Sequence, residues 1–306
     1  MNVDKVKPNG LALLPIIVFL ILFIGIGVVQ KDFYSMPAVI GFLIALAVAF
    51  LQTRGISFNE KISIIAKGVG DDNIITMCLI FLVAGAFSGS VSAAGGVSST
   101  VNLGLSLLPP GIAVIGLFVI GCFISISMGT SMGTIAALAP IAMGISEKTD
   151  FPIAICIGAV VSGAMFGDNL SMISDTTIAA VRTQGCDMRD KFRKNFLIVL
   201  PAAIATIVIL FFMTSGAHFT VSKDLDYNIF QVIPYILVLV TALIGLNVFI
   251  VLIGGIAFSV IAGLATGAMK VSQIFTSMGK GATGMYDITV ISILVACISA
   301  LVKYNG

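Results

Sequence analysis

Charged side chains are scarce in this sequence: only 10% of its 306 residues are Asp, Glu, Lys or Arg, against 58% that are apolar. A soluble domain carries roughly 25% charged residues. No charge at all occurs in residues 73–146, a stretch long enough for more than one transmembrane helix of about 20 residues. This deficit excludes an ordinary globular domain and predicts an all-α polytopic membrane protein embedded in a lipid bilayer.

Histidine and cysteine are too few and too scattered for a zinc site or a disulfide framework. His218 is the only histidine, and the five cysteines lack C-x-x-C spacing. The net charge of +2 is too small to indicate a nucleic-acid partner. The Gly-, Ala- and Ser-rich segment 88–100 contains no Walker-type Gly-Lys-Thr. That segment therefore indicates tight helix packing or a re-entrant loop, and we do not expect an ATPase.

Nine apolar runs are candidates for membrane-spanning helices. The first of them follows Lys5 and Lys7 without a signal-peptide cleavage site, so we expect it to be retained. The nine runs are Leu11–Val29, Met36–Gln52, Ile74–Ser92, Ile112–Ser127, Phe151–Gly167, Phe196–Ser215, Ile229–Leu246, Val248–Ala265 and Ile288–Val302. Two further runs, Met128–Ile145 and Asp168–Gln184, begin with polar residues, and we expect interrupted or half-length helices there.

The placement of Lys and Arg predicts how the chain is oriented, because short cytoplasmic loops carry an excess of both. The densest basic cluster lies within residues 182–194, and further basic residues occur at the N-terminus and within residues 54–67. We expect all three segments on the cytoplasmic side of a bacterial inner membrane. The segment that contains His218 would then lie outside.

The two ends of the chain resemble each other at a shift of 213 residues. This shift aligns Ile40-Gly41 with Ile253-Gly254 and Lys67-Gly68 with Lys280-Gly281. Because the first unit would enter from the cytoplasm and the second from outside, the repeat would be inverted, as in many secondary transporters. Chance similarity of two apolar stretches is the alternative. We expect a first repeat unit at residues 1–222 and the start of a second unit at residues 223–306, which is incomplete as in a truncated chain.

The most informative polar segment, GDNLSMISDTT at residues 167–177, directly follows an apolar run. Carboxylates at membrane depth are costly and indicate a functional site. Carboxylate, amide and hydroxyl oxygens can together replace the water shell of Na⁺, and removal from water favours the protonated carboxyl, so Na⁺ and H⁺ can compete. The predicted ligands are Asp168, Asn169, Ser171, Ser174, Asp175 and Thr176. The alternative is that Asp168 and Ser174 only cap helix ends at the membrane surface.

A tetrapeptide written twice, SMGTSMGT at residues 127–134, is the second polar segment. Its two glycines, four residues apart, are typical of close helix packing, which is the structural alternative. The functional interpretation is a flexible break whose carbonyl and hydroxyl oxygens face the same cation. Its predicted contributors are Gly129, Thr130, Ser131, Gly133 and Thr134.

These segments, at residues 129–142 and 167–180, resemble the NhaC-type Na⁺/H⁺ antiporters, and the resemblance extends from residue 8 to the end of the chain. The family is part of an ion-transporter superfamily built from inverted repeats with broken helices and hairpins. The resemblance implies transport driven by ion gradients, without a cofactor and without enzymatic activity. It also implies a possible homodimer, and family members continue into a second half-site that this sequence lacks.

The resemblance does not fix the substrate, and three hypotheses remain. The first is exchange of Na⁺ for H⁺ by alternating access, with Asp168 and Asp175 binding both ions competitively. The second is a Na⁺- or H⁺-coupled carrier of a small carboxylate or amino acid, because relatives include carriers similar to malate/lactate antiporters. Arg182 is the only nearby guanidinium for a substrate carboxylate, and its place in the basic cluster assigns it to the cytoplasmic face, which argues against this hypothesis. The third is a membrane protein that does not transport.

Overall fold

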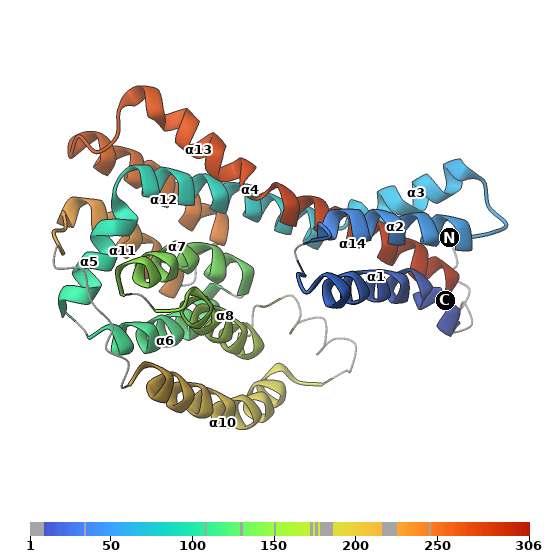
Figure 1. Cartoon of the computed structure of the whole chain (residues 1–306), viewed down its shortest axis with the longest axis horizontal. Coiled ribbons are helices and arrows are strands. Elements are labelled where there is room, and N and C mark those ends of the chain that lie inside the picture. Colours follow the sequence, from blue (N-terminus) through green and yellow to red (C-terminus); the bar gives the residue numbers. More distant parts are fainter. Residues whose placement is uncertain are drawn as a thin grey trace. The chain divides into compact units, whose positions relative to one another are not determined.

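The computed structural model describes residues 9–33, 35–107, 109–128, 131–149, 151–171, 174, 177, 186–215, 225–244 and 246–306. Most of this part of the chain is helical, and it contains no strand (Figure 1). The helices are η1 (Gly10–Leu13), α1 (Leu14–Gln30), α2 (Ala38–Gln52), α3 (Phe58–Val69), α4 (Asp72–Ala93), α5 (Gly96–Leu107), α6 (Pro110–Met128), α7 (Ser131–Thr149), α8 (Ile153–Leu170), α10 (Met188–Thr214), α11 (Ile229–Leu243), α12 (Val248–Ala265), η2 (Val271–Gln273), α13 (Ile274–Thr283) and α14 (Tyr286–Asn305).

Every apolar run predicted as a span forms a helix, and most helix ends lie within three residues of the prediction. Helix α10 differs most, since it begins at Met188 rather than near Phe196. Among the described residues, six helices are long and apolar enough to cross a membrane. Helices α5 and α6 together add a candidate broken or re-entrant span, bent by 117°. The chain is thus an integral membrane protein with an all-helical fold.

The chain divides into two compact units. Unit 1 comprises Met1–Phe81 and Met285–Gly306, so it contains α1, α2, α3, the start of α4, and α14. Helix α14 packs against α2 and α3. The side-chain amide of Asn305 donates to Thr53 Oγ1 at 2.8 Å, and α14 therefore ends beside the end of α2.

Unit 2 comprises Leu82–Gly284, and its most extensive helix packing is that of α6 against α8. A Cβ on Gly163 of α8 would overlap the carbonyl oxygen of Phe118 in α6, and one on Gly167 would lie 2.5 Å from the Cβ of Ser125. The contact of Gly167 lies further along both helices than the contact of Gly163, so α6 and α8 run parallel. Glycine at these two positions lets the helix backbones touch, which fixes the end of α8.

Three helices fall outside the predicted spans because they are short. Helices α3 and α13 carry polar and apolar residues on opposite faces, and α5 occupies part of the small-residue segment 88–100. The chain turns between α4 and α5 at Gly95, whose φ of +76° favours glycine. At the start of α4, Asp71 Oδ1 accepts from the backbone N–H of Asn73 at 3.0 Å, which is the N-cap expected of an aspartate there.

Candidate functional site

The two polar segments meet at one end of unit 2. Ser131, the first residue of α7, donates its hydroxyl to Asp168 Oδ2 at 3.0 Å. The contact follows from the order of the helices. At the opposite end of the pair, Ser146 donates to the carbonyl of Phe151 at 2.7 Å, so α7 and α8 form an antiparallel hairpin. The start of α7 therefore lies beside the end of α8.

Close packing on α6 holds the end of α8 in place. Ser125 of α6 donates its hydroxyl to the carbonyl of Ala164 at 2.6 Å, and Gly167 presses against Cys122 and Ser125. Helix α8 ends at Leu170, and the N–H of Ser171 donates to the carbonyls of Gly167 (2.9 Å) and Asp168 (3.2 Å). Asp168 is thus a residue of the last helical turn.

The carboxylate of Asp168 is placed where a cation would be attracted. Its Oδ1 is buried and has no hydrogen-bond partner within the described part of the chain. A carboxylate in the last turn of a helix opposes the helix dipole, whereas the start of α7 next to it favours negative charge. A buried, unpaired carboxylate oxygen is costly. A small cation bound at Oδ1 would remove that cost.

Lys191 of α10 is a site residue that sequence reasoning assigned only to the basic cluster. Its ammonium donates to the carbonyl of Asn169 at 2.6 Å and to Thr177 Oγ1 at 2.7 Å. Asn195, one turn further along α10, also donates to the Asn169 carbonyl, at 3.2 Å. The available signal was a lysine in the first turn of the next apolar helix after the polar segment.

The predicted ligands are placed differently from one another. The side-chain amide of Asn169 donates to its own helix at Met165 (2.9 Å), so its backbone carbonyl rather than its side chain joins the cluster. Ser171, Ser174 and Thr134 are buried, as is Gly133. Asp175, Thr176, Gly129 and Thr130 lie outside the described residues, so their assignment to the cation site stays a prediction.

The chemistry of the site is oxygen-based. Carboxylate, hydroxyl and carbonyl oxygens are ligands for hard cations. Within the part of the chain that the structure describes, no group of three or more His, Cys, Asp or Glu residues could hold a metal ion. Ser131 contacts the Asp168 carboxylate directly, whereas the Asn169 carbonyl and the Thr177 hydroxyl are joined through Lys191. One carboxylate with neutral oxygens suits a monovalent cation better than a divalent one.

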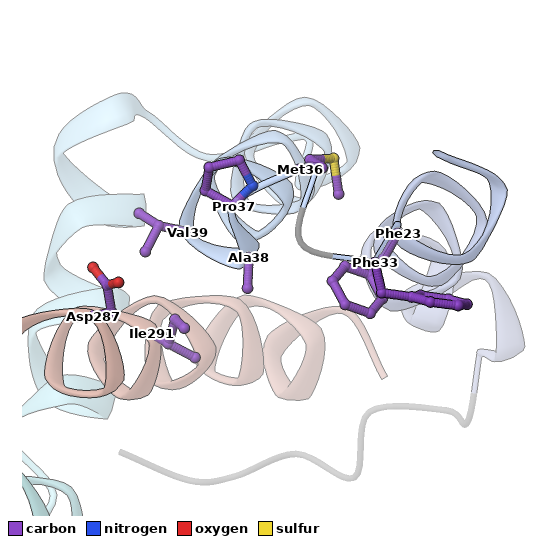
Figure 2. Close-up of a pocket in the computed structure, with 8 residues that line it drawn as sticks. All are labelled: Phe23, Phe33, Met36, Pro37, Ala38, Val39, Asp287 and Ile291. Carbon is purple, nitrogen blue, oxygen red and sulfur yellow. The ribbon is translucent and has the colours of Figure 1, made fainter. Parts of the chain in front are cut away.

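Two of the cavities formed by the described residues bear on the choice of site. The larger, of about 680 Å³, lies in unit 1 and is walled by apolar side chains such as Phe23, Phe33 and Ile291, with Asp287 at its edge (Figure 2). It offers one exposed carboxylate and no converging hydroxyl groups. The smaller, of about 190 Å³, lies between α6, α8 and α10 and is lined by Asn169. Only the smaller cavity adjoins the Asp168 cluster.

Known proteins resemble this chain in the region that contains the Asp168 site. A sequence model of the Na⁺/H⁺ antiporter family covers residues 9–215, which include both polar segments. The chain is 27% identical to a malate-2H⁺/Na⁺-lactate antiporter of Bacillus subtilis, over 74% of this chain and 52% of that protein. It is 25% identical to the Na⁺/H⁺ antiporter NhaC of Alkalihalophilus pseudofirmus, over 91% of this chain and 62% of that protein.

A third relative, an uncharacterised Na⁺/H⁺ antiporter of Haemophilus influenzae, is 29% identical over 64% of this chain and 42% of that protein. The chain thus spans about half the length of these curated relatives. The family match extends over more than half of the chain and contains the Ser131–Asp168 contact. The resemblance noted from the two polar segments is confirmed: this chain belongs to the Na⁺/H⁺ antiporter family.

Proposed function

We propose that this chain exchanges Na⁺ for H⁺ across the bacterial inner membrane by alternating access. Asp168 and Asp175 bind the two ions competitively, and neighbouring hydroxyl and carbonyl oxygens complete the shell around Na⁺. The observation that carries the proposal is the Asp168 carboxylate, with Oδ2 held by Ser131 and Oδ1 buried and unpaired among the described residues. A proton or a Na⁺ ion satisfies that oxygen, and the two cannot bind together.

The experiment is proton flux in everted vesicles that lack other exchangers, read with a pH-sensitive dye after NaCl is added. We expect Na⁺-triggered alkalinisation from the wild type and none from Asp168→Asn. The matched control is Asp287→Asn, since Asp287 borders the apolar cavity of unit 1. Unchanged exchange by an inserted Asp168→Asn variant would contradict the assignment.

We also propose that the fold contains the inverted repeat, and the helix bounds support it. At a shift of 213 residues, α2 corresponds to α12, α3 to α13 with η2, and α4 to α14. The local contacts correspond as well. Thr53 and Thr266 each cap their helix by donating to the carbonyl four residues earlier, at 2.8 Å in both cases. The same bond occurs at other threonines of the chain, such as Thr149 and Thr206, so its weight here comes from the equivalent position at the end of α2 and of α12.

The start of each following helix adds a second correspondence. The N–H of Ser57 donates to Glu60 Oε2 at 2.7 Å, and the N–H of Lys270 donates to Gln273 Oε1 at 2.9 Å. Each pair is separated from its counterpart by the same 213 residues (270 − 57 and 273 − 60). The repeat units at 1–222 and 223–306 would then begin with equivalent sets of helices.

The directions of α4 and α14 within unit 1 support inversion. Helix α14 begins at the cavity that it shares with the start of α2. It runs toward Ala300, which Gly68 of α3 contacts. Helix α4 begins at Asp72, shortly after Gly68. The two counterparts therefore start at opposite ends of unit 1, as inverted repeats require.

The second candidate is a Na⁺- or H⁺-coupled carrier of a small carboxylate or amino acid. Two observations favour it: the similarity to a malate-2H⁺/Na⁺-lactate antiporter, and the Lys191 ammonium, which supplies a cation near the site. Thermal stabilisation of the purified chain separates the candidates. Exchange of Na⁺ for H⁺ predicts stabilisation by Na⁺ or Li⁺ alone, whereas the carrier requires malate, lactate or an amino acid as well.

The remaining features of the proposal concern placement and assembly. We propose that the start of α10 and the Asp168 site lie near the cytoplasmic face, with the N-terminus on the same side; the excess of Lys and Arg within residues 182–194 supports this orientation. We also propose that the protein forms a homodimer, because the family resemblance implies one. Site-specific labelling and crosslinking in membranes test these two points separately.

A further inference from the structure

Lys191 and Asp168 both occupy helix ends that disfavour their charges. Lys191 lies in the first turn of α10, where the helix dipole is positive, and Asp168 lies in the last turn of α8, where it is negative. Each charge is therefore unfavourable by itself and is stabilised by the other, and the two interact electrostatically. Placing both at the unfavourable ends has no evident structural benefit over neutral residues.

The ammonium of Lys191 also occupies oxygens that a bound cation would use. It donates to the Asn169 carbonyl at 2.6 Å and to Thr177 Oγ1 at 2.7 Å. Thr177 belongs to the polar segment and is 3% exposed, so its hydroxyl is not freely replaced by water, whereas Asn169 is exposed. Asn169 follows Asp168 directly in the sequence, so both acceptors belong to the polar segment that is proposed to bind the cation.

We propose that Lys191 is the resident cation of the Asp168 site: its ammonium holds the Asn169 carbonyl and the Thr177 hydroxyl when no ion is bound, and an entering Na⁺ takes these oxygens and displaces it. Two positive charges repel each other, and the same two oxygens cannot hold both cations at once. Na⁺ and the ammonium therefore exclude each other from the shared oxygens. The inference rests on the proposed binding of Na⁺ at Asp168, and it makes Lys191 a residue that sets cation affinity.

Removal of the competing charge has a definite expected effect. Lys191→Met keeps the apolar stem but removes the ammonium, so apparent Na⁺ affinity should rise about tenfold. Lys191→Arg keeps the charge and should remain close to the wild type. Lys194→Met is the matched control, because Lys194 is exposed on the same helix end. Affinity is measured at one fixed pH for all four proteins.

The direct test uses the wild-type chain in detergent or nanodiscs and needs no variant to fold. Lysines are modified with an amine-reactive reagent at increasing NaCl, with choline chloride holding the ionic strength constant, and each site is quantified by mass spectrometry. We expect modification of Lys191 to increase several-fold with Na⁺ while modification of Lys194 stays constant. Isotopic Na⁺ binding is measured on the same samples.

The outcomes separate this inference from the proposed function. If Na⁺ binds but Lys191 modification does not change, or if Lys191→Met binds Na⁺ no more tightly than the wild type, the resident-cation role is wrong and the antiport proposal stands. If the wild type binds no Na⁺, the proposed cation site is wrong and this inference fails with it. Increased modification together with tighter binding by Lys191→Met supports the inference.

Discussion

Ser131 donates its hydroxyl to Asp168 at 3.0 Å across 37 residues of sequence. This hydrogen bond joins the start of α7 to the end of α8, and with them the two polar segments that sequence analysis had singled out separately. Because the other carboxylate oxygen is buried and unpaired in the described part of the chain, the bond orients Asp168 without neutralising it. The cation site proposed for this chain depends on that orientation.

The Ser131 hydroxyl can be removed with little change in volume. Ser131→Ala should weaken Na⁺ binding about tenfold, because a hydrogen bond to a charged group contributes about 1.5–3 kcal/mol. Ser131→Thr should retain most of the affinity. Ser106→Ala is the control, since the Ser106 hydroxyl is exposed and bonds only its own helix at Leu103. Equal Na⁺ affinity of Ser131→Ala and the wild type would show that the bond does not orient the carboxylate.

Because α6 and α8 pack closely, one methyl group added between them should have a large effect on stability and Na⁺ binding. Gly167→Ala should lower thermal stability and abolish Na⁺ binding, because the added Cβ would overlap the Cys122 carbonyl and lie 2.5 Å from the Ser125 Cβ. Gly158→Ala on the same helix has nothing within 4 Å of its added Cβ, so it should be neutral or slightly stabilising. Equal melting temperatures for the two variants would argue against the observed packing.

The inverted repeat predicts which helix ends share a side of the membrane. In a cysteine-free background, single cysteines at Ser35 and Tyr286 should react with an impermeant thiol reagent from the same side. Cysteines at Asn59 and Asn305 should react only from the opposite side. The physical reason is that α14 begins beside the start of α2 and ends beside Thr53. Labelling of Ser35 and Tyr286 positions from opposite sides would rule out this arrangement.

The start of α3 should be sensitive to acid. Hydrogen bonds from Ser57 hold the pKa of Glu60 below its ordinary value. A carboxyl whose pKa is lower in the folded state stabilises the fold above its unfolded pKa, and that contribution is lost as the pH falls through the folded pKa. Amide hydrogen exchange at residues 58–61 should therefore increase, after correction for intrinsic rates, as the pH is lowered below the ordinary range of glutamate. Glu60→Gln should show a flat profile.

Hydropathy alone located most of this fold. The apolar runs from Leu11 to Val302 became helices because about 20 consecutive apolar residues can satisfy their backbone in lipid only as helices. Helices α3 and α13 were not predicted, since they are short and carry polar residues on one face and apolar residues on the other. Helix α10 begins earlier than expected because its basic first turn looked like a loop, although Arg and Lys are good helix formers.

The candidate site could be predicted only in part. The composition of the segments around Ser131 and Asp168 marked both as unusual at membrane depth. Their contact depends on the antiparallel packing of α7 on α8, which no local pattern specifies. Lys191 was grouped with its basic neighbours because position in the sequence does not show that its ammonium reaches the Asn169 carbonyl.

The central claim is that Asp168 binds the cation, and equilibrium binding of isotopic Na⁺ to the purified chain tests it most directly. The wild type, Asp168→Asn and Asp287→Asn are compared at one pH, with equal folding confirmed by thermal melts. We expect the wild type and Asp287→Asn to bind Na⁺ saturably and Asp168→Asn to bind none. Saturable binding by Asp168→Asn with wild-type affinity would contradict the account.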